Sequence, residues 1–309
     1  MKTASIITEK IIAALTKGTV PWQRPFLHGS PKRSCGKEYR GINSLLLNFV
    51  QSEAGYTSPY WITYNEATKL GATVRPGEKS TIVVFWKKLI FNDNSSIEDT
   101  DTDDNINDET STQRPRFMLR FYRVFNACQC DGLPLRFHPG HSTPILEIGK
   151  YQRADAIISG YPNAPLIREA MTTPHYSPTT DIVCTPPMSQ AVSPEAYYST
   201  MFHELAHSTG HEKRLNRPLK NEFGSKEYAR EELIAEMAAC FLCAEAGIEP
   251  MIENSASYIN SWLGALQKDH NLVVVAAGKA QHAADHILDR KPQTATTPAE
   301  SQSSATAGA

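Results

Sequence analysis

The chain of 309 residues lacks any hydrophobic run long enough to cross a membrane. A transmembrane helix needs about 20 consecutive apolar residues, and no apolar run in the sequence approaches that length. The first residues do not resemble a secretory signal either, because Glu9 and Lys10 interrupt their apolar stretch. We therefore expect a cytoplasmic protein without a membrane-bound segment.

Cysteine is scarce, and the spacing of its six residues excludes a zinc ribbon. Cys128 and Cys130 form one close pair and Cys240 and Cys243 another, but neither has a second pair at the distance that a ribbon requires. Cys240 and Cys243 also lie in an apolar stretch with helical periodicity. This setting favours buried, reduced thiols over metal ligands.

Net charge is almost absent, at -2 for the whole chain, but the two halves differ. Residues 1–138 carry 18 Lys and Arg and 14 Asp and Glu, and eight of these acids lie between Asp93 and Glu109. The rest of this half is therefore strongly basic, whereas residues 139–309 carry 13 basic and 19 acidic side chains. This asymmetry indicates two domains with different tasks.

The sequence predicts an α+β protein. Residues 1–135 should form an α+β domain, because segments rich in β-branched and aromatic residues alternate with a few helical segments. We expect the strands to form a small antiparallel sheet. Within it, residues 92–113 are acidic and polar, and we expect a disordered insertion. Residues 136–149 form a linker, 150–290 a mainly helical domain, and 291–309, rich in Thr, Ser and Ala, a disordered tail.

One motif in the helical half carries recognisable chemistry, His203-Glu204-Leu205-Ala206-His207. On a helix, His203 and His207 lie one turn apart on the same face, where both rings can reach one metal ion. Glu204 is then placed to take a proton from a water on that metal. The arrangement is typical of zinc peptidases. A chance match of three fixed residues occurs roughly once in fifty chains of this kind, but the amphipathic helical setting favours the metal site.

Two histidines leave a catalytic zinc site incomplete, since three protein ligands are usual. A third histidine six residues after His207 is excluded, because Lys213 occupies that position. His211 would share the face of His207 only if the helix continued beyond Gly210, where we expect it to end. His211 therefore remains an alternative ligand.

The better third ligand lies in an acidic helix expected at about 225–246. Glu232 and Glu236 are one turn apart there, on a face that is otherwise apolar, and a divalent cation is one of few remedies for buried unpaired carboxylates. The spacing resembles the second helix of thermolysin-like zincins, which implies Glu232 as the ligand and Glu236 as support for a motif histidine. The reverse assignment stays open. We expect Zn²⁺, with Mn²⁺ as an alternative. The group that stabilises the oxyanion stays open between Tyr176, Tyr228 and His211.

The basic half interleaves cationic side chains with aromatic ones. Cations neutralise phosphates and aromatic faces stack on unpaired bases, so the combination indicates a single-stranded nucleic acid as partner. A single buried aromatic residue is more often part of a core, so only the combination with the charge excess favours this interpretation. The candidate DNA-binding residues are Trp22, Arg24, Lys32, Arg33, Arg40, Tyr60, Trp61, Lys87 and Lys88.

The order of several motifs resembles the family of ArdC-like antirestriction proteins. Its N-terminal domain is matched at residues 21–26, 39–43, 60–64, 74–79 and 124–126, and its C-terminal metallopeptidase-like domain at 176–181, 203–207, 210–216 and 231–236. The resemblance implies a protein of conjugative plasmids or other mobile elements that binds single-stranded DNA and protects incoming DNA from host restriction. Host restriction-modification proteins are then candidate partners. Plasmid primases share the N-terminal domain, so the alternative is a conjugation or replication accessory protein whose metal site is structural or vestigial.

Overall fold

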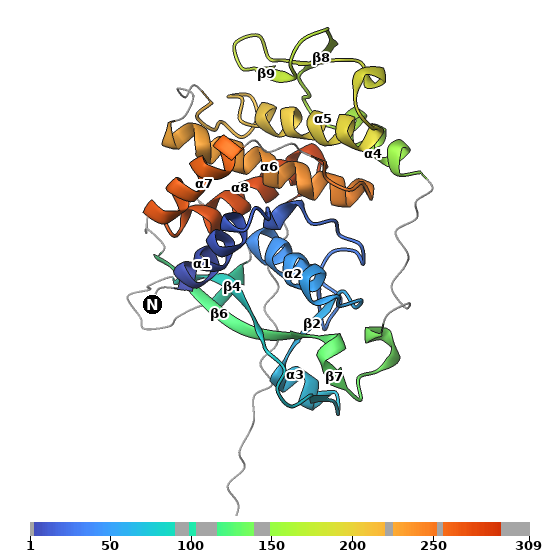
Figure 1. Cartoon of the computed structure of the whole chain (residues 1–309), viewed down its shortest axis with the longest axis vertical. Helices are drawn as coiled ribbons and strands as arrows, with labels where there is room; N and C mark the ends of the chain where they lie inside the picture. Colours follow the sequence, from blue (N-terminus) through green and yellow to red (C-terminus); the bar gives the residue numbers. More distant parts are fainter. Residues whose placement is uncertain are drawn as a thin grey trace, which may run out of the picture.

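The computed structural model describes residues 3–89, 99–102, 116–138, 149–219, 225–251 and 256–291. It confirms the expected α+β class, with small sheets in the N-terminal half and a mainly helical C-terminal half (Figure 1). Residues 292–309, most of the stretch at 92–113 and most of the linker expected at 136–149 lie outside the described residues. Within the described ranges, no helix is both long and apolar enough to cross a membrane.

The N-terminal half is built on a five-stranded sheet. Strands β2, β6, β4 and β5 are antiparallel neighbours in that order, and β1 pairs with β2 in parallel. β5 lies inside the acidic stretch at 92–113, where we expected no regular structure, and pairs Asp101 with Lys87 of β4. The strands are β1 (Lys32–Arg33), β2 (Tyr60–Thr63), β4 (Thr81–Leu89), β5 (Asp99–Thr102) and β6 (Arg116–Asn126).

Shorter elements close the end of this sheet. Helix α3 (Tyr64–Lys69) starts from a reciprocal cap, in which the Thr63 hydroxyl accepts from the Glu66 N–H at 3.2 Å and the Glu66 carboxylate accepts from the Thr63 N–H at 2.7 Å. Beside it, β3 (Thr73–Val74) and β7 (Cys130–Asp131) form a two-stranded sheet. Single 3₁₀ turns occupy η1 (Pro21–Gln23), η2 (Ala127–Gln129) and η3 (Leu135–Phe137).

Two longer helices cover the sheet, α1 (Thr3–Thr16) and α2 (Gly41–Ala54). We expected Asn43 or Ser44 to cap α2, but the helix begins earlier, at Gly41. Asn43 instead faces the edge of β4, where its Oδ1 accepts from the Val84 N–H at 2.8 Å and its Nδ2 donates to the Val84 carbonyl at 2.6 Å. The buried amide thus takes the place of a neighbouring strand at this point of the edge.

In the described part of the C-terminal half, five helices pack together with a small sheet on one side. The three-stranded sheet β8–β10–β9 lies beyond α5 in Figure 1. The Ser193 and Ser225 side chains cap α5 and α6, and Gly247 ends α6 with φ of 73°. The elements are α4 (Lys150–Ser159), β8 (Leu166–Glu169), β9 (His175–Ser177), β10 (Ile182–Thr185), α5 (Pro194–Ser208), α6 (Lys226–Ala246), α7 (Ala256–Lys268) and α8 (Leu272–Ile287). A further 3₁₀ turn, η4, spans Met188–Gln190.

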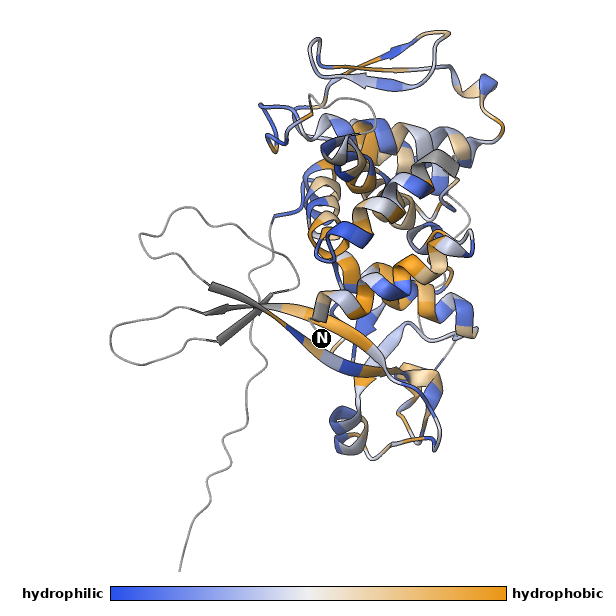
Figure 2. Cartoon of the chain, turned by 60° about the vertical axis from the view of Figure 1, so that its left-hand side comes forward, coloured by the Kyte–Doolittle hydropathy of each residue, from blue (hydrophilic) through white to orange (hydrophobic). Residues whose placement is uncertain are grey.

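One hydrophobic core runs through both halves, because α1 packs on α7 and α2 on α8. Figure 2 shows hydrophobic residues concentrated in the helices between the two larger sheets. Polar contacts fix the same interface. Arg40 forms an ion pair with Asp285 of α8, and the Gly41 N–H donates to Gln281 Oε1 at 3.0 Å. The two halves are therefore packed as neighbours and not merely connected by a linker.

Replacing Asn43 with Ala should destabilise the fold. The change leaves the N–H and the carbonyl of Val84 without partners, and each buried polar group without a partner costs about 1–3 kcal/mol. We expect the free energy of unfolding to fall by on the order of 2–4 kcal/mol. Urea unfolding followed by circular dichroism measures it. Asn65→Ala, at an exposed position of α3, is the control and should change stability by less than about 0.5 kcal/mol. Equal midpoints for the two variants would contradict this role of Asn43.

Candidate metal centre

Helix α5 presents the two motif histidines on one face. Ser193 starts the helix by accepting a hydrogen bond from the Ala196 N–H at 3.1 Å, and Pro194 occupies the first helical position. The Nε2 atoms of His203 and His207, one turn apart, are 3.1 Å from each other. Two nitrogens at this distance point at one spot between them.

Glu232 of α6 completes a group of three. Its carboxylate oxygens lie 3.6 Å from His203 Nε2 and 3.6 Å from His207 Nε2. A tetrahedral Zn²⁺ with bonds of about 2.0–2.1 Å separates its ligand atoms by roughly 3.3–3.4 Å, so the three observed separations fit one divalent cation. His203, His207 and Glu232 are the set of His, Cys, Asp and Glu side chains that the described residues offer to a metal.

The charges of this group support cation binding. Burial alone would raise the pKa of Glu232, but the hydrogen bond to His203 and the charges of both histidines lower it. Burial would lower the pKa of His203, yet the bond to Glu232 and the carboxylates of Glu204 and Glu236 raise it to about 9, so a cation that binds here displaces a proton from this ring. A carboxylate held in its ionised form is the form that a cation binds.

Glu231, the residue before Glu232, supports His207 from behind. Its Oε1 lies 3.4 Å from His207 Nδ1, and Arg217 holds the same carboxylate with Nη2 at 2.6 Å and Nε at 3.0 Å. Arg217 is itself fixed by Thr209 Oγ1 at 2.6 Å and by the Ala206 carbonyl at 2.9 Å. Burial would raise the pKa of Glu231, but His207 and Arg217 lower it. Carboxylates in this position orient metal-binding histidines and increase their basicity.

Sequence reasoning missed both Glu231 and Arg217. It assigned the support of a motif histidine to Glu236, which is buried in the pocket wall. No hydrogen bond from Glu236 to either histidine is among the described contacts, so this assignment stays a prediction. Burial raises the pKa of Glu236 to about 7, partly offset by the charge of His203. The adjacent acids at 231 and 232 could have indicated this support, because neighbouring residues on a helix can reach the two ring nitrogens of one histidine.

The remaining candidates, His211, Tyr176 and Tyr228, differ in what their side chains contact. His211 is in the turn after α5, where its Nδ1 accepts from the Lys213 N–H at 3.2 Å, and it is not part of the metal-binding group. Tyr176 donates to Asp181 at 2.8 Å. Tyr228 hydrogen bonds to Glu232. Of the three groups considered for the oxyanion, Tyr228 is the one that contacts a ligand of the group.

A pocket of about 670 Å³ opens beside the metal group. His203, Glu232 and Glu236 line one part of it, and the general-base candidate Glu204 is buried next to His203 on α5. The other walls are largely apolar and come from the segments around β9, β10 and the start of α5. They include Pro174, Pro186, Pro187, Val192, Ala196, Tyr197 and Met251.

The structure corrects part of the candidate DNA-binding set. Trp22 and Trp61 are only 1% and 0% exposed, so neither ring can stack on a base, and for these two residues the prediction is wrong. Each fills a core, because a large apolar ring gains more from burial than from exposure. Tyr60 is half-buried and packs edge-on against Phe137, with 5.1 Å between ring centroids. Arg40 is engaged by Asp285.

The other basic candidates remain at the surface or outside the described side chains. Arg24 is paired with Glu53 at 2.7 Å, with 38% of its side chain exposed. Lys32 and Arg33 are half-buried in β1. Lys87 and Lys88 belong to β4, and their side chains are not among the described ones.

An aromatic and basic surface on one face of the large sheet joins Arg33 of the candidate set to three residues outside that set. We call Arg33, Phe85, Arg120 and Tyr122 the Arg33–Tyr122 surface. The Arg33 guanidinium lies 4.9 Å from the Phe85 ring, and Tyr122 meets the same ring at 5.3 Å. Arg120 pairs with Phe85 across the strands and shares the face of Tyr122, two residues on. Tyr122 is 38% exposed, and Phe121 on the opposite face is 46% exposed.

Comparison with known proteins connects the two halves to two families. Residues 1–125 match the N-terminal domain of the anti-restriction factor ArdC, and residues 152–279 match a zincin-like metallopeptidase. Two crystal structures of the antirestriction ArdC protein from the R388 plasmid are similar, both with a TM-score of 0.75. The metal-free one shares 35% identity over 94% of this chain and all of that chain, and the Mn(II)-bound one 37% over 94% and 98%.

Two primases and one further bacterial protein are also similar to this chain. The DNA primase TraC of Escherichia coli is 35% identical over 294 residues, which is 91% of this chain but 26% of the primase. A second Escherichia coli primase of that name is 35% identical over 92% of this chain, which spans 20% of that primase. The protein y4eC of Sinorhizobium fredii is 33% identical over 90% of this chain and 89% of its own length. Together with the family and structure matches, these similarities confirm the family resemblance stated from the motifs.

Glu231→Gln should weaken divalent cation binding by about 10-fold, because loss of an outer carboxylate on a metal-binding histidine typically costs 10- to 100-fold in affinity. Indicator competition with Zn²⁺ and Mn²⁺ measures the change. Glu227→Gln, in the first turn of the same helix and exposed, should leave affinity unchanged. If both variants bind either ion as the wild type does, Glu231 does not support the site.

Proposed function

Because the chain belongs to the ArdC antirestriction family and carries a zincin-like metallopeptidase domain, we propose that it protects incoming mobile-element DNA from host restriction. It does so in the cytoplasm by binding the DNA as a single strand, with a working peptidase centre in its second half. The observation that supports the peptidase is the convergence of His203, His207 and Glu232 with Glu204 intact beside them. Host restriction-modification proteins are the partners that this activity implies.

The chemistry at the centre follows from the residues present. Zn²⁺ is the expected ion and Mn²⁺ an alternative, and such an ion supplies Lewis-acid chemistry to the site when bound. His203, His207 and Glu232 hold it. Glu204 acts as general base towards the attacking water and then passes the proton to the leaving amine. Tyr228, which hydrogen bonds to Glu232, helps to orient that ligand.

Glu204→Gln should abolish peptidase activity and leave metal content unchanged, because the side chain is not a ligand. Transfer of unmodified plasmid DNA into restricting and non-restricting recipients then tests the biological role. We expect the variant to lose protection, as should His203→Ala combined with His207→Ala. Protection at the wild-type level by Glu204→Gln would contradict a role of peptidase activity in protection and favour a protector that acts through DNA binding alone.

We assign the single-stranded DNA to the Arg33–Tyr122 surface. It combines an exposed tyrosine ring with Arg120 and Arg33, and stacking of a base on an aromatic side chain contributes about 1–3 kcal/mol. The excess of basic residues in this half supplies the long-range attraction to phosphates. Lys32, Arg24, Lys87 and Lys88 extend this basic character along the same half of the chain.

Tyr122→Ala should lower the affinity for oligo(dT) by about 10-fold, which is the loss of one base stack. Arg120→Ala should also reduce the steepness of the salt dependence, since one phosphate contact disappears. Fluorescence anisotropy at several salt concentrations measures both. Phe121→Ala is the matched control, because Phe121 is at least as exposed as Tyr122 but lies on the opposite face of β6. Equal losses for Phe121→Ala and Tyr122→Ala would place the DNA elsewhere.

The similarity to primases supports a second candidate. In that role the chain is a conjugation or replication accessory factor that binds single strands, and the metal site is structural or vestigial. The chain spans only 26% and 20% of the two primases, so their activity is not carried over. The transfer assay separates the two, because an accessory factor changes transfer equally into restricting and non-restricting recipients.

A further inference from the structure

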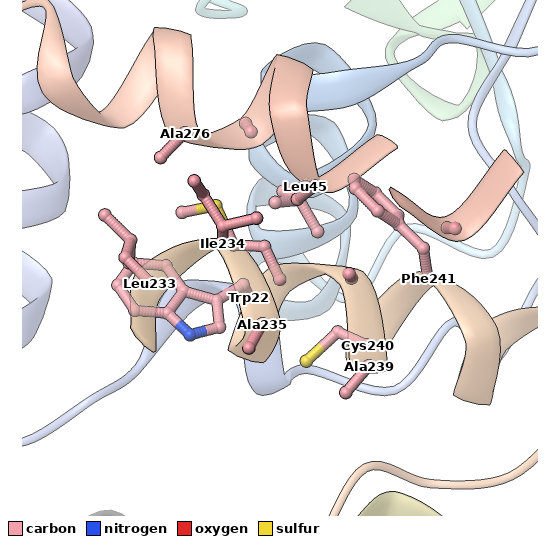
Figure 3. Packing of buried hydrophobic residues seen from close by; sticks show 14 of the residues in the cluster. Trp22, Leu45, Leu233, Ile234, Ala235, Ala239, Cys240, Phe241 and Ala276 are labelled. Atoms are coloured by element: carbon pink, nitrogen blue, oxygen red, sulfur yellow. The ribbon is translucent and has the colours of Figure 1, made fainter. Parts of the chain in front are cut away.

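The turn η1 carries the N-terminal half into direct contact with the metal-binding helix α6. Trp22 of this turn is buried, and Figure 3 shows it beside Leu233 and Ala235 of α6. Its ring also meets Trp262 of α7 edge-on, with 5.3 Å between centroids and 69° between planes. The indole thus anchors the turn between two helices of the other half.

Gln23, the next residue, hydrogen bonds to the carboxylate of Glu236. Glu236 is 4% exposed, lines the metal pocket, and lies one turn along α6 from the ligand Glu232. Its Oε2 has no hydrogen-bond partner among the described residues. This buried oxygen therefore still needs a donor.

A second buried atom in the same wall also lacks a partner. His203 Nδ1, on the opposite side of the ring from the metal-binding Nε2, has no hydrogen bond among the described residues. Both side chains line the metal pocket. A buried polar atom without a partner is costly, so the two groups are expected to satisfy each other directly or through one water.

We propose that Gln23 is a positioning residue of the metal centre, contributed by the N-terminal half. Its amide holds Glu236 so that the carboxylate faces the His203 ring, as Arg217 holds Glu231 against His207. The centre is then complete only when the turn η1 is seated on α6. This role concerns cation binding and stands whether or not the centre cleaves peptides.

Contacts on both sides hold the turn in its place. On one side of it, α1 packs on α7, with the Thr8 hydroxyl donating to the His270 carbonyl at 2.6 Å. Beyond it, the Asn48 amide of α2 donates to the Arg24 carbonyl at 2.8 Å. Contacts before and after Gln23 therefore fix its backbone, and its side chain reaches Glu236 from a defined position.

The test is cation affinity in the full-length chain. Gln23→Met keeps the length of the side chain and removes the donor, and it should weaken Zn²⁺ and Mn²⁺ binding by about 10-fold, within the range for outer groups of metal sites. Gln51→Met is the matched control, a buried glutamine on α2, and should bind as the wild type does. Circular dichroism establishes that both variants are folded, and Gln23→Leu replaces Gln23→Met if the latter is not.

A double-mutant cycle distinguishes positioning from general destabilisation. If Gln23 acts through Glu236, the variant carrying Gln23→Met and Glu236→Gln should bind no more weakly than Glu236→Gln alone. The visible spectrum of the Co²⁺-loaded protein should shift in Gln23→Met and remain unchanged in Gln51→Met. Wild-type affinity in Gln23→Met, or additive losses in the cycle, would overturn the proposal. A wild-type chain that binds neither cation would overturn the metal centre itself.

Discussion

Three carboxylates are buried on the helix that forms the centre of this protein, and the cost of burying them constrains everything around it. Glu231, Glu232 and Glu236 lie on α6, where the other residues between Leu233 and Cys243 are all apolar and buried. A buried acid is tolerated only with compensating donors or cations. Each of the three is compensated from a different direction. Arg217, beyond α5, holds the first, the histidines of α5 meet the second, and a glutamine of the N-terminal half bonds to the third.

This arrangement explains why the two halves share a core. The metal-binding helix is too apolar to face solvent, and α7 and α8 cover only part of it. The turn with Trp22 covers another part, while α1 and α2 extend the same packing. Arg40 belongs to this interface through Asp285, although its charge suggested a role in binding DNA. Part of the basic excess of the N-terminal half is therefore used to hold the protein together, which narrows the surface left for a polyanion.

The sequence predicted the features that depend on local periodicity. The spacing of His203 and His207 indicated a helix, and the pair Glu232 and Glu236 indicated a second one, so both helices and the grouping of His203, His207 and Glu232 could be foreseen. Features that depend on packing between residues far apart in the sequence could not be predicted. Composition does not distinguish a buried tryptophan from an exposed one, which is why Trp22 and Trp61 were placed wrongly. Arg217 and Gln23 are 14 and more than 200 residues from the acids they hold, and no spacing rule connects them.

The contact between α1 and α7 has a consequence for synthesis on the ribosome. Residues 3–16 also contact η1 and β6, but the apolar stripe that packs on α7 meets that partner only when residues 256–268 have been made, about 240 residues later. At typical translation rates of about 5–20 residues per second, that stripe stays uncovered for roughly 10–50 seconds. A nascent chain with such a stripe is a natural client for holding chaperones. Its yield in the cell should depend on them more than on the final stability of the fold.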